Sequence, residues 1–257
     1  MATRARIAAL RADPAFASLA RSLEVYYGDP KHDAAMDALY ARFVRAGDLV
    51  FDIGAHVGDR IGSFRRLGAR VVALEPQPLC ASAIRAIYGG DDKVALAEAA
   101  CGAQAGTVTL RLNSANPTVS TASAEFVAAA DGAGGWEGQA WDKAIEVPCT
   151  TLDALIAEHG RPAFAKIDVE GFEAVVLAGL SQTLPALSFE FTTIQRDVAL
   201  ACLDRLALLG PYAFDVALGE SQALTFNRWI SRDDMASHLM GLPHAANSGD
   251  VYCVLQR

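Results

Sequence analysis

Short apolar runs alternate with stretches of helical periodicity in the first half of this chain. Residues 48–55, DLVFDIGA, form one apolar run, and residues 69–76, ARVVALEP, form a second run that a proline stops. Such runs are typical of buried parallel strands. Residues 59–68 lie between them and read as a helix closed by Gly68. The pattern predicts a parallel sheet whose strands are joined by helices.

The same alternation continues along the rest of the chain, with one interruption. The helix over residues 150–160 begins with Thr150 and Asp153, which resemble a capping box. Strands are predicted over residues 93–102, 163–171 and 186–191, and helices over residues 77–90, 150–160, 172–180 and 195–210. We therefore expect one α/β domain over residues 48–257.

Residues 1–47 are predicted to be a helical N-terminal extension. Apolar side chains at Met36, Leu39, Tyr40 and Phe43 fall on one helical face, and Gly47 then ends the helix. This extension packs either on its own sheet or on a second subunit, so a homo-oligomer stays open as an alternative.

The interruption covers residues 103–149, in which we predict one strand, GTVTLRL. Residues 113–142 are rich in small residues and interrupted by glycine. An insertion of this length is usually a lid, a binding loop or a disordered segment. We expect it either to close over an acceptor, with Trp136 and Trp141 stacking on a sugar, or to be a surface loop anchored by these tryptophans.

Composition narrows the classes of partner. The 257 residues are 52% hydrophobic and carry a net charge of −8, which is typical of a globular protein with an acidic surface. Such a surface repels phosphate backbones, so we expect no nucleic-acid partner. The N-terminus has no continuous apolar run, and no stretch is long and apolar enough to span a bilayer. We therefore expect no signal peptide and no membrane partner.

Cysteine and histidine spacing argues against a disulfide framework and a metal cluster. The cysteines are odd in number and widely spaced, and the histidines show no metal-ligand spacing. We therefore expect a reducing, cytoplasmic compartment and predict no metal ligand. The residues concerned are Cys80, Cys101, Cys149, Cys202, Cys253, His32, His56, His159, His238 and His244.

The stretch VFDIGAHVGDR (50–60) indicates a nucleotide-like ligand that is not a dinucleotide. The dinucleotide fingerprint G-x-G-x-x-G needs a middle glycine, which this loop with Gly54 and Gly58 lacks. Asp52 also places a carboxylate just before the turn. A carboxylate there opposes a pyrophosphate but suits the ammonium and sulfonium of S-adenosylmethionine. Glu75, 23 residues after Asp52, ends the second strand, where an acid can bind both ribose hydroxyls.

A second acidic group follows a central strand. Lys166, Asp168 and Glu170 share one face of KIDVEG, and Glu190 lies near the end of the next strand. Ligands of open α/β sheets bind beyond the carboxyl ends of the strands, so we predict that the three acids face a substrate. Lys166 is expected to pair with a carboxylate, and the alternative for Glu170 is that it caps the next helix. A variant has Asp168 and Glu190 coordinating a divalent ion.

Several segments together resemble the FkbM family of S-adenosylmethionine-dependent methyltransferases. The resemblance covers residues 48–191, and KIDVEGFE is its most distinctive part. It is carried by VFDIGAHVGDR, VVALEPQP, AACGAQAGTVTL, TTLDALIAEHG, AFAKIDVEGFEAVVLAGL and LSFEF. The resemblance implies a Rossmann-like class I methyltransferase domain with a seven-stranded, mostly parallel sheet. The last strand, DVYCVLQR, would be antiparallel and next to YAFDVAL.

The resemblance also implies O-methylation of a sugar or natural-product hydroxyl. The family often has asparagine where this chain has His56, and either side chain can hydrogen-bond to the carboxylate end of the cofactor. The cofactor site is predicted to comprise Asp52, Gly54, Ala55, His56, Gly58, Glu75, Pro76, Ala99 and Ala100, and the catalytic group Asp168, Glu170 and Glu190.

Two alternatives stay open at this point. The first is a nicotinamide-dependent oxidoreductase, against which the missing glycine and Asp52 argue. The second is a non-catalytic module that binds S-adenosylmethionine.

Overall fold

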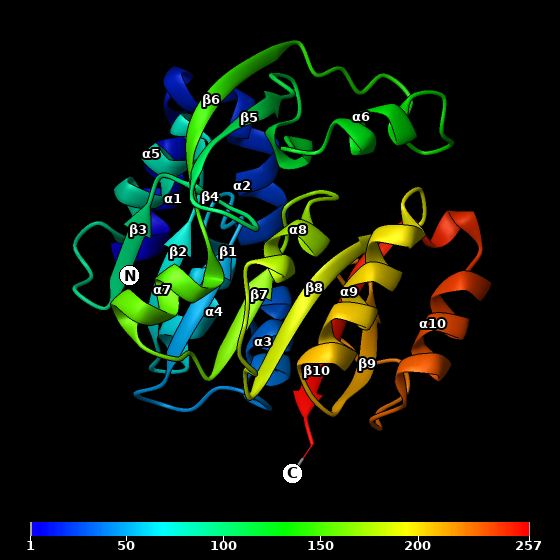
Figure 1. The fold of residues 1–257 in the computed structure, drawn as a ribbon. Helices are drawn as coiled ribbons and strands as arrows, with labels where there is room; N and C mark the ends of the chain where they lie inside the picture. Colours follow the sequence, from blue (N-terminus) through cyan, green and yellow to red (C-terminus); the bar gives the residue numbers. More distant parts are fainter. Residues whose placement is uncertain (1, 257) are drawn as a thin grey trace.

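A seven-stranded sheet forms the centre of the computed structural model, which describes residues 2–256 (Figure 1). The strand order is β3-β2-β1-β7-β8-β10-β9. Neighbouring strands pair in parallel from β3 to β8, and β10 is antiparallel to both β8 and β9. The strands are β1 (Leu49–Ile53), β2 (Arg70–Leu74), β3 (Val94–Ala97), β7 (Phe164–Ile167), β8 (Ala186–Thr192), β9 (Tyr212–Leu218) and β10 (Ser248–Leu255).

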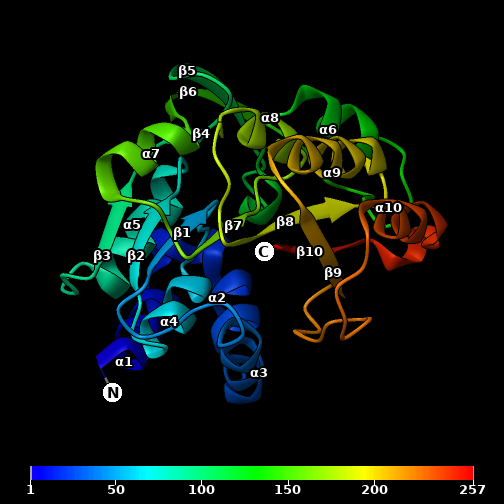
Figure 2. The same ribbon diagram turned by 60° about the horizontal axis from the view of Figure 1, so that its bottom comes forward.

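Helices cover both faces of this sheet, as Figure 2 shows. One face packs against α1 (Ala2–Ala12), the 3-10 turn η1 (Pro14–Leu19), α2 (Ala20–Tyr27), α3 (Pro30–Tyr40), α4 (Asp59–Arg66) and α5 (Pro78–Tyr88). The other face packs against α7 (Leu152–His159), α8 (Glu173–Ala178), α9 (Arg196–Leu209) and α10 (Arg232–Gly241). Successive side chains of a strand point to opposite faces of the sheet, so Phe51 and Ile53 of β1 pack in one core and Val50 packs in the other.

A smaller sheet and the inserted segment lie above the carboxyl ends of the main strands in Figure 1. The smaller sheet has the order β4-β6-β5, formed by β4 (Ala100–Cys101), β5 (Gly106–Leu112) and β6 (Lys143–Thr150). Between β5 and β6 the chain forms the turn η2 (Pro117–Val119) and helix α6 (Ala124–Ala130). Phe126 and Trp136 are buried together in a small core of this segment, so it is a folded unit.

The sheet and its antiparallel β10 confirm the fold expected from the sequence, with corrections to single elements. The strand predicted over residues 93–102 divides into β3 and β4, which belong to different sheets. Helix α3 ends at Tyr40, and Gly47 instead lies in a later turn with φ of +88°. Thr151, not Thr150, caps α7 by accepting a hydrogen bond from the amide of Ala154.

Strand β6 and helices α6 and α10 were not predicted at all. The single turns η2 and η3 (His244–Ala246) were not predicted either. Met1 and Arg257, the ends of the predicted N-terminal helical segment and final strand, lie outside the described residues. Within residues 2–256, no helix combines the length and apolar character needed to cross a membrane.

Candidate active site

A cavity lies at the carboxyl ends of the parallel strands. All predicted site residues line it except Asp52 and Gly58. The wall is built from the β1–α4 loop, the end of β2, the segment leading into β4, and the ends of β7 and β8. The position is the one at which open α/β sheets bind ligands.

The glycines of the β1–α4 loop are required by the backbone. Gly54 and Gly58 both have φ of +83°, a left-handed conformation that favours glycine. A Cβ atom on Gly54 would lie 1.8 Å from the carbonyl oxygen of Asp168, so this loop packs directly on the end of β7. Gly58 precedes α4, and a Cβ atom there would face Ile61, Ile84 and Tyr88. Gly58 therefore shapes the loop without lining the cavity.

His56 lies in the cavity wall with φ of +48°, a conformation in which asparagine and histidine are over-represented. This explains why the two residue types can exchange at this position. Its Nδ1 lies 3.6 Å from Cys80 Sγ and its Nε2 lies 3.3 Å from Thr118 Oγ1. Burial lowers the pKa of His56 to about 4, so the ring is neutral at pH 7. Both ring nitrogens thus face protein atoms, which leaves the predicted contact with a cofactor carboxylate without support.

Glu75 ends β2 and is held in a fixed orientation. Its two carboxylate oxygens accept hydrogen bonds of 2.8 Å from the backbone amides of His56 and Gln77. The side chain is 2% exposed, and burial raises its pKa to about 8. Each oxygen keeps a lone pair for a further donor, and the cavity lies in front of it. The two hydroxyl groups of a ribose could donate to these free acceptor positions on the Glu75 carboxylate.

The wall beside Glu75 is apolar and narrow. It includes Pro76, Ala99, Ala100 and Leu110, the last of which comes from β5 of the smaller sheet. Small and aliphatic side chains next to a ribose-binding acid suit a flat heteroaromatic ring. These residues would hold the adenosine part of S-adenosylmethionine.

Asp52 lies behind the loop and outside the cavity wall. It is fully buried, and neither carboxylate oxygen has a hydrogen-bond partner within the described part of the chain. Its partner in the β1–β7 register is Lys166, so both side chains are on the same face of the sheet. Burial raises the pKa of Asp52 to about 7. Any effect of Asp52 on a cofactor would therefore act through the loop or through its charge.

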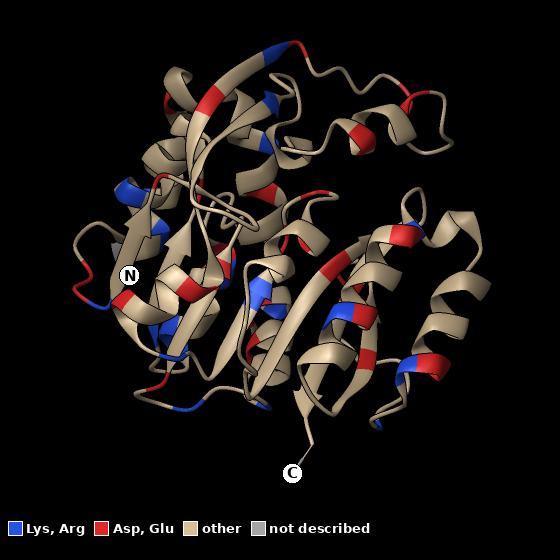
Figure 3. Cartoon of the chain, viewed as in Figure 1, with Lys and Arg blue, Asp and Glu red and all other residues tan. Residues whose placement is uncertain are grey.

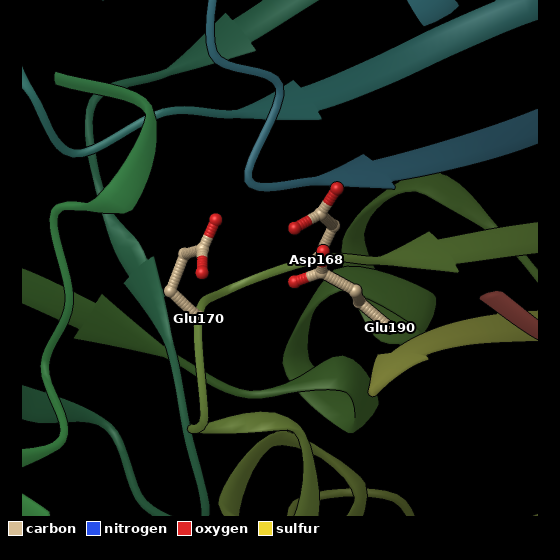
Figure 4. Close-up of side chains that lie close together, drawn as sticks. All are labelled: Asp168, Glu170 and Glu190. Atoms are coloured by element: carbon tan, nitrogen blue, oxygen red, sulfur yellow. The ribbon is translucent and has the colours of Figure 1, made fainter. Parts of the chain in front are cut away.

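The three predicted catalytic acids converge in the cavity. One carboxylate oxygen from each of Asp168, Glu170 and Glu190 lies within 4.8 Å of the others (Figure 4). Lys166 forms an ion pair with Asp168, as predicted. Although burial acts in the opposite direction, the Lys166 ammonium and a hydrogen bond with Glu190 lower the pKa of Asp168. Burial and the neighbouring Asp168 charge raise the pKa of Glu190 and of Glu170 well above the ordinary value.

Glu170 does not cap the following helix. Within the described residues no side chain caps this helix, and Glu173 Oε1 instead accepts from the backbone amides of Val169 and Gly171 in the turn before it. Glu170 itself has φ of +56°, and its carbonyl oxygen accepts a hydrogen bond of 2.6 Å from Thr121 Oγ1. This turn directs the Glu170 side chain into the cavity (Figure 4).

Several lining residues come from segments that sequence reasoning did not connect with the site. Tyr26 of α2 contacts the His56 ring edge-on, with ring centroids 5.8 Å apart. Thr118 and Ser120 come from the inserted segment, and Glu220 follows β9 and accepts from Arg60, which also lines the cavity. No local motif marks these residues. Figure 3 shows that acidic and basic positions are spread over the whole chain, so charge alone does not locate them.

The tryptophans of the insertion do not line the cavity. Trp136 packs edge-on against Phe126 with a centroid distance of 5.1 Å, and Trp141 donates from Nε1 to the carbonyl oxygen of Val119 at 2.8 Å. Both act as anchors of the inserted segment, which corresponds to the second of the two expectations from the sequence.

This chain resembles several solved methyltransferase structures at low identity. The precorrin-6y C5,15-methyltransferase of Geobacter metallireducens GS-15 shares 13% identity over 88% of this chain and 87% of that chain, with a TM-score of 0.45. An O-methyltransferase of Bacillus cereus in complex with SAH shares 10% identity over 93% and 91%, with a TM-score of 0.47. Likeness at this level carries no argument about the site. No curated protein sequence matches the chain.

The family comparison is more informative. The sequence model of the methyltransferase FkbM domain matches residues 52–205, which is more than half of the chain. The matched region contains Glu75 and the three converging acids. The family match excludes the alternative that this chain is a nicotinamide-dependent oxidoreductase. The chain belongs to the FkbM family of S-adenosylmethionine-dependent methyltransferases, and S-adenosylmethionine is its methyl donor.

Proposed function

We propose that this protein methylates a hydroxyl group of a small-molecule acceptor, either a saccharide or another natural product. The observation that carries the proposal is the convergence of Asp168, Glu170 and Glu190 in the same cavity as the ribose-binding candidate Glu75. A hydroxyl acceptor must lose a proton during transfer, and carboxylates are suitable proton acceptors.

The acidic group has the properties of a base. The bound cofactor supplies a methyl group on a sulfonium sulfur, which keeps the electron pair of the broken carbon–sulfur bond when the acceptor oxygen bonds to the methyl carbon. Lys166 keeps Asp168 ionised, so Asp168 accepts a hydrogen bond from the acceptor and orients it. Burial raises the pKa of Glu170 and of Glu190, so each carboxylate in its ionised form is a stronger acceptor for the hydroxyl proton than an ordinary glutamate. Alignment of the two reacting atoms supplies much of the remaining acceleration.

The rest of the cavity supports a polar, uncharged acceptor. Thr118 and Ser120 add hydroxyl groups to the wall, and carboxylates accept hydrogen bonds from an acceptor that carries several hydroxyls. The acidic surface also disfavours nucleic acid. All five cysteines are free, which fits a reducing compartment such as the cytoplasm.

The proposal is tested by measuring methyl transfer from labelled S-adenosylmethionine to a panel of sugars, glycosides and hydroxylated natural products. Asp168→Asn should reduce turnover on the best acceptor by about 10²-fold, the effect of a misplaced reacting group, and change the cofactor Kd only a few-fold. Glu158→Gln removes an exposed acid and serves as the charge-matched control. Equal losses in turnover and cofactor affinity would place Asp168 in the cofactor site, and transfer only to amines or thiols would contradict O-methylation.

A further inference from the structure

The acidic cavity contains more carboxylate charge than its basic residues balance. Lys166 lies against Asp168 and has Asp52 opposite it in the neighbouring strand. Arg60 is engaged by Asp59 and Glu220. Glu190 hydrogen-bonds with Asp168. None of these arrangements provides a positive partner for Glu170.

Glu170 is the side chain left without a partner. It is 8% exposed, and its carboxylate has neither a hydrogen-bond donor nor a basic group in contact among residues 2–256. Its side chain nevertheless points at the Asp168–Glu190 pair (Figure 4). A buried carboxylate aimed at two others is unfavourable unless a cation or a proton joins them.

The spacing of the three oxygens suits one divalent cation. Oxygens on opposite sides of Ca²⁺ are about 4.6–5.2 Å apart, and those around Mg²⁺ are about 4.0–4.2 Å apart. The three carboxylate oxygens lie within 4.8 Å of one another. Three oxygens around one Ca²⁺ at about 2.3–2.6 Å would be at most about 4.0–4.5 Å apart, so the group would hold Ca²⁺ after a small inward shift of the side chains and Mg²⁺ after a larger one. Oxygen-only ligands are those that such hard cations prefer.

We propose that Asp168, Glu170 and Glu190 form a divalent-cation site that holds the acceptor hydroxyl. Asp168 contributes one carboxylate oxygen, and the cavity leaves room for water and the acceptor as further ligands. The cation would bind the hydroxyl oxygen and lower its pKa, so that the proton would leave to water as the oxygen bonds to the methyl carbon, and the three acids would then act as ligands in place of the base role given above. This step rests on the proposed O-methylation, whereas ion binding itself does not.

Ion binding is measured by isothermal titration of CaCl2 and of MgCl2 into the full-length protein without cofactor. We expect saturable binding of one ion to the wild type and to the control Glu158→Gln. Glu170→Gln should bind at least about tenfold more weakly, because charge count sets the affinity of such sites. A second variant, Glu190→Gln, should show the same loss. Thermal stabilisation by S-adenosylhomocysteine, measured on each preparation, verifies that the variants are folded.

Three results would overturn the cation site. The first is that the wild type binds no ion at about 10⁻³ M, which is the weak end of known oxygen-ligand sites. The second is that the wild type and Glu170→Gln bind the ion with equal affinity, and the third is that methyl transfer is undiminished in EDTA. The last result would leave the methyltransferase proposal intact. Failure of every acceptor to be methylated, with ion binding retained, would instead contradict O-methylation and leave the cation site standing.

Discussion

At the scale of single residues, Glu75 differs from the other acids in the cavity because backbone amides hold its carboxylate. Two amide donors fix its carboxylate, so ribose recognition needs no reorganisation of the side chain. We expect Glu75→Gln to raise the Kd for S-adenosylhomocysteine by roughly ten- to a hundredfold, as for the loss of two hydrogen bonds to the ribose hydroxyls. Isothermal titration measures this change.

Glu98→Gln is the control for this substitution, because Glu98 is an exposed acid that pairs with Arg85 just before β4. Its cofactor affinity should equal that of the wild type. If Glu75→Gln binds S-adenosylhomocysteine as tightly as Glu98→Gln, the ribose assignment is wrong.

The sequence locates residues of the site where one rule applies, namely that ligands lie beyond the carboxyl ends of parallel strands. Glu75, Asp168 and Glu190 follow from it and line the cavity. Asp52 was placed by its proximity to the glycine loop, but strand alternation turns its side chain toward the face covered by α3 and α4. Tyr26 and Glu220 reach the cavity only through tertiary folding, so no local pattern could reveal them.

At the scale of elements, strands and helices with strong patterns were predictable, and those with weak patterns were not. Strand β1 is buried on both faces and reads as a continuous apolar run. Strand β6 lies between β4 and β5 and includes Pro148, a residue that usually argues against a strand. Helix α10 mixes charged and apolar residues without a clear stripe and buries only Met235, Ala236 and Leu239.

Helix α2 lies outside the family match yet is bonded to the glycine loop. Tyr27 donates its hydroxyl to the carbonyl oxygen of Val57 at 2.9 Å, and its oxygen lies 3.1 Å from that of Tyr88. Tyr27→Phe leaves this carbonyl without its donor and loosens the loop. We expect the Kd for S-adenosylhomocysteine to rise about 2- to 12-fold, the equivalent of one neutral hydrogen bond.

Val25→Ala is the control for α2, because Val25 is 52% exposed on the same helix. It should leave both cofactor affinity and the urea midpoint unchanged, whereas Tyr27→Phe should lower the midpoint as well. An unchanged Kd in Tyr27→Phe would mean that α2 packs on the loop without supporting it.

At the scale of the whole molecule, the buried acids make stability depend on pH. Burial raises the pKa of Glu75 to about 8 and those of Asp52 and Glu173 to about 7. The folded protein therefore binds more protons than the unfolded chain between the ordinary and the raised pKa values. His56 acts in the opposite direction, because burial lowers its pKa to about 4, but this effect ends near the ordinary value of about 6.5.

Above pH 6.5 all of these groups act with the same sign. Their contribution to stability is fully present below the ordinary pKa of about 4 and falls until pH passes the raised values of about 7 and 8, so the free protein should still lose several degrees in Tm between about pH 6.5 and 8. Asp52→Asn removes one buried charge that has no hydrogen-bond partner among the described residues. It should flatten this decrease and raise Tm at pH 8, whereas the exposed control Asp92→Asn should follow the wild type. A Tm that rises with pH over this interval would show that the buried carboxyls are already ionised at pH 6.5, held by a cation or by water within the same polar layer.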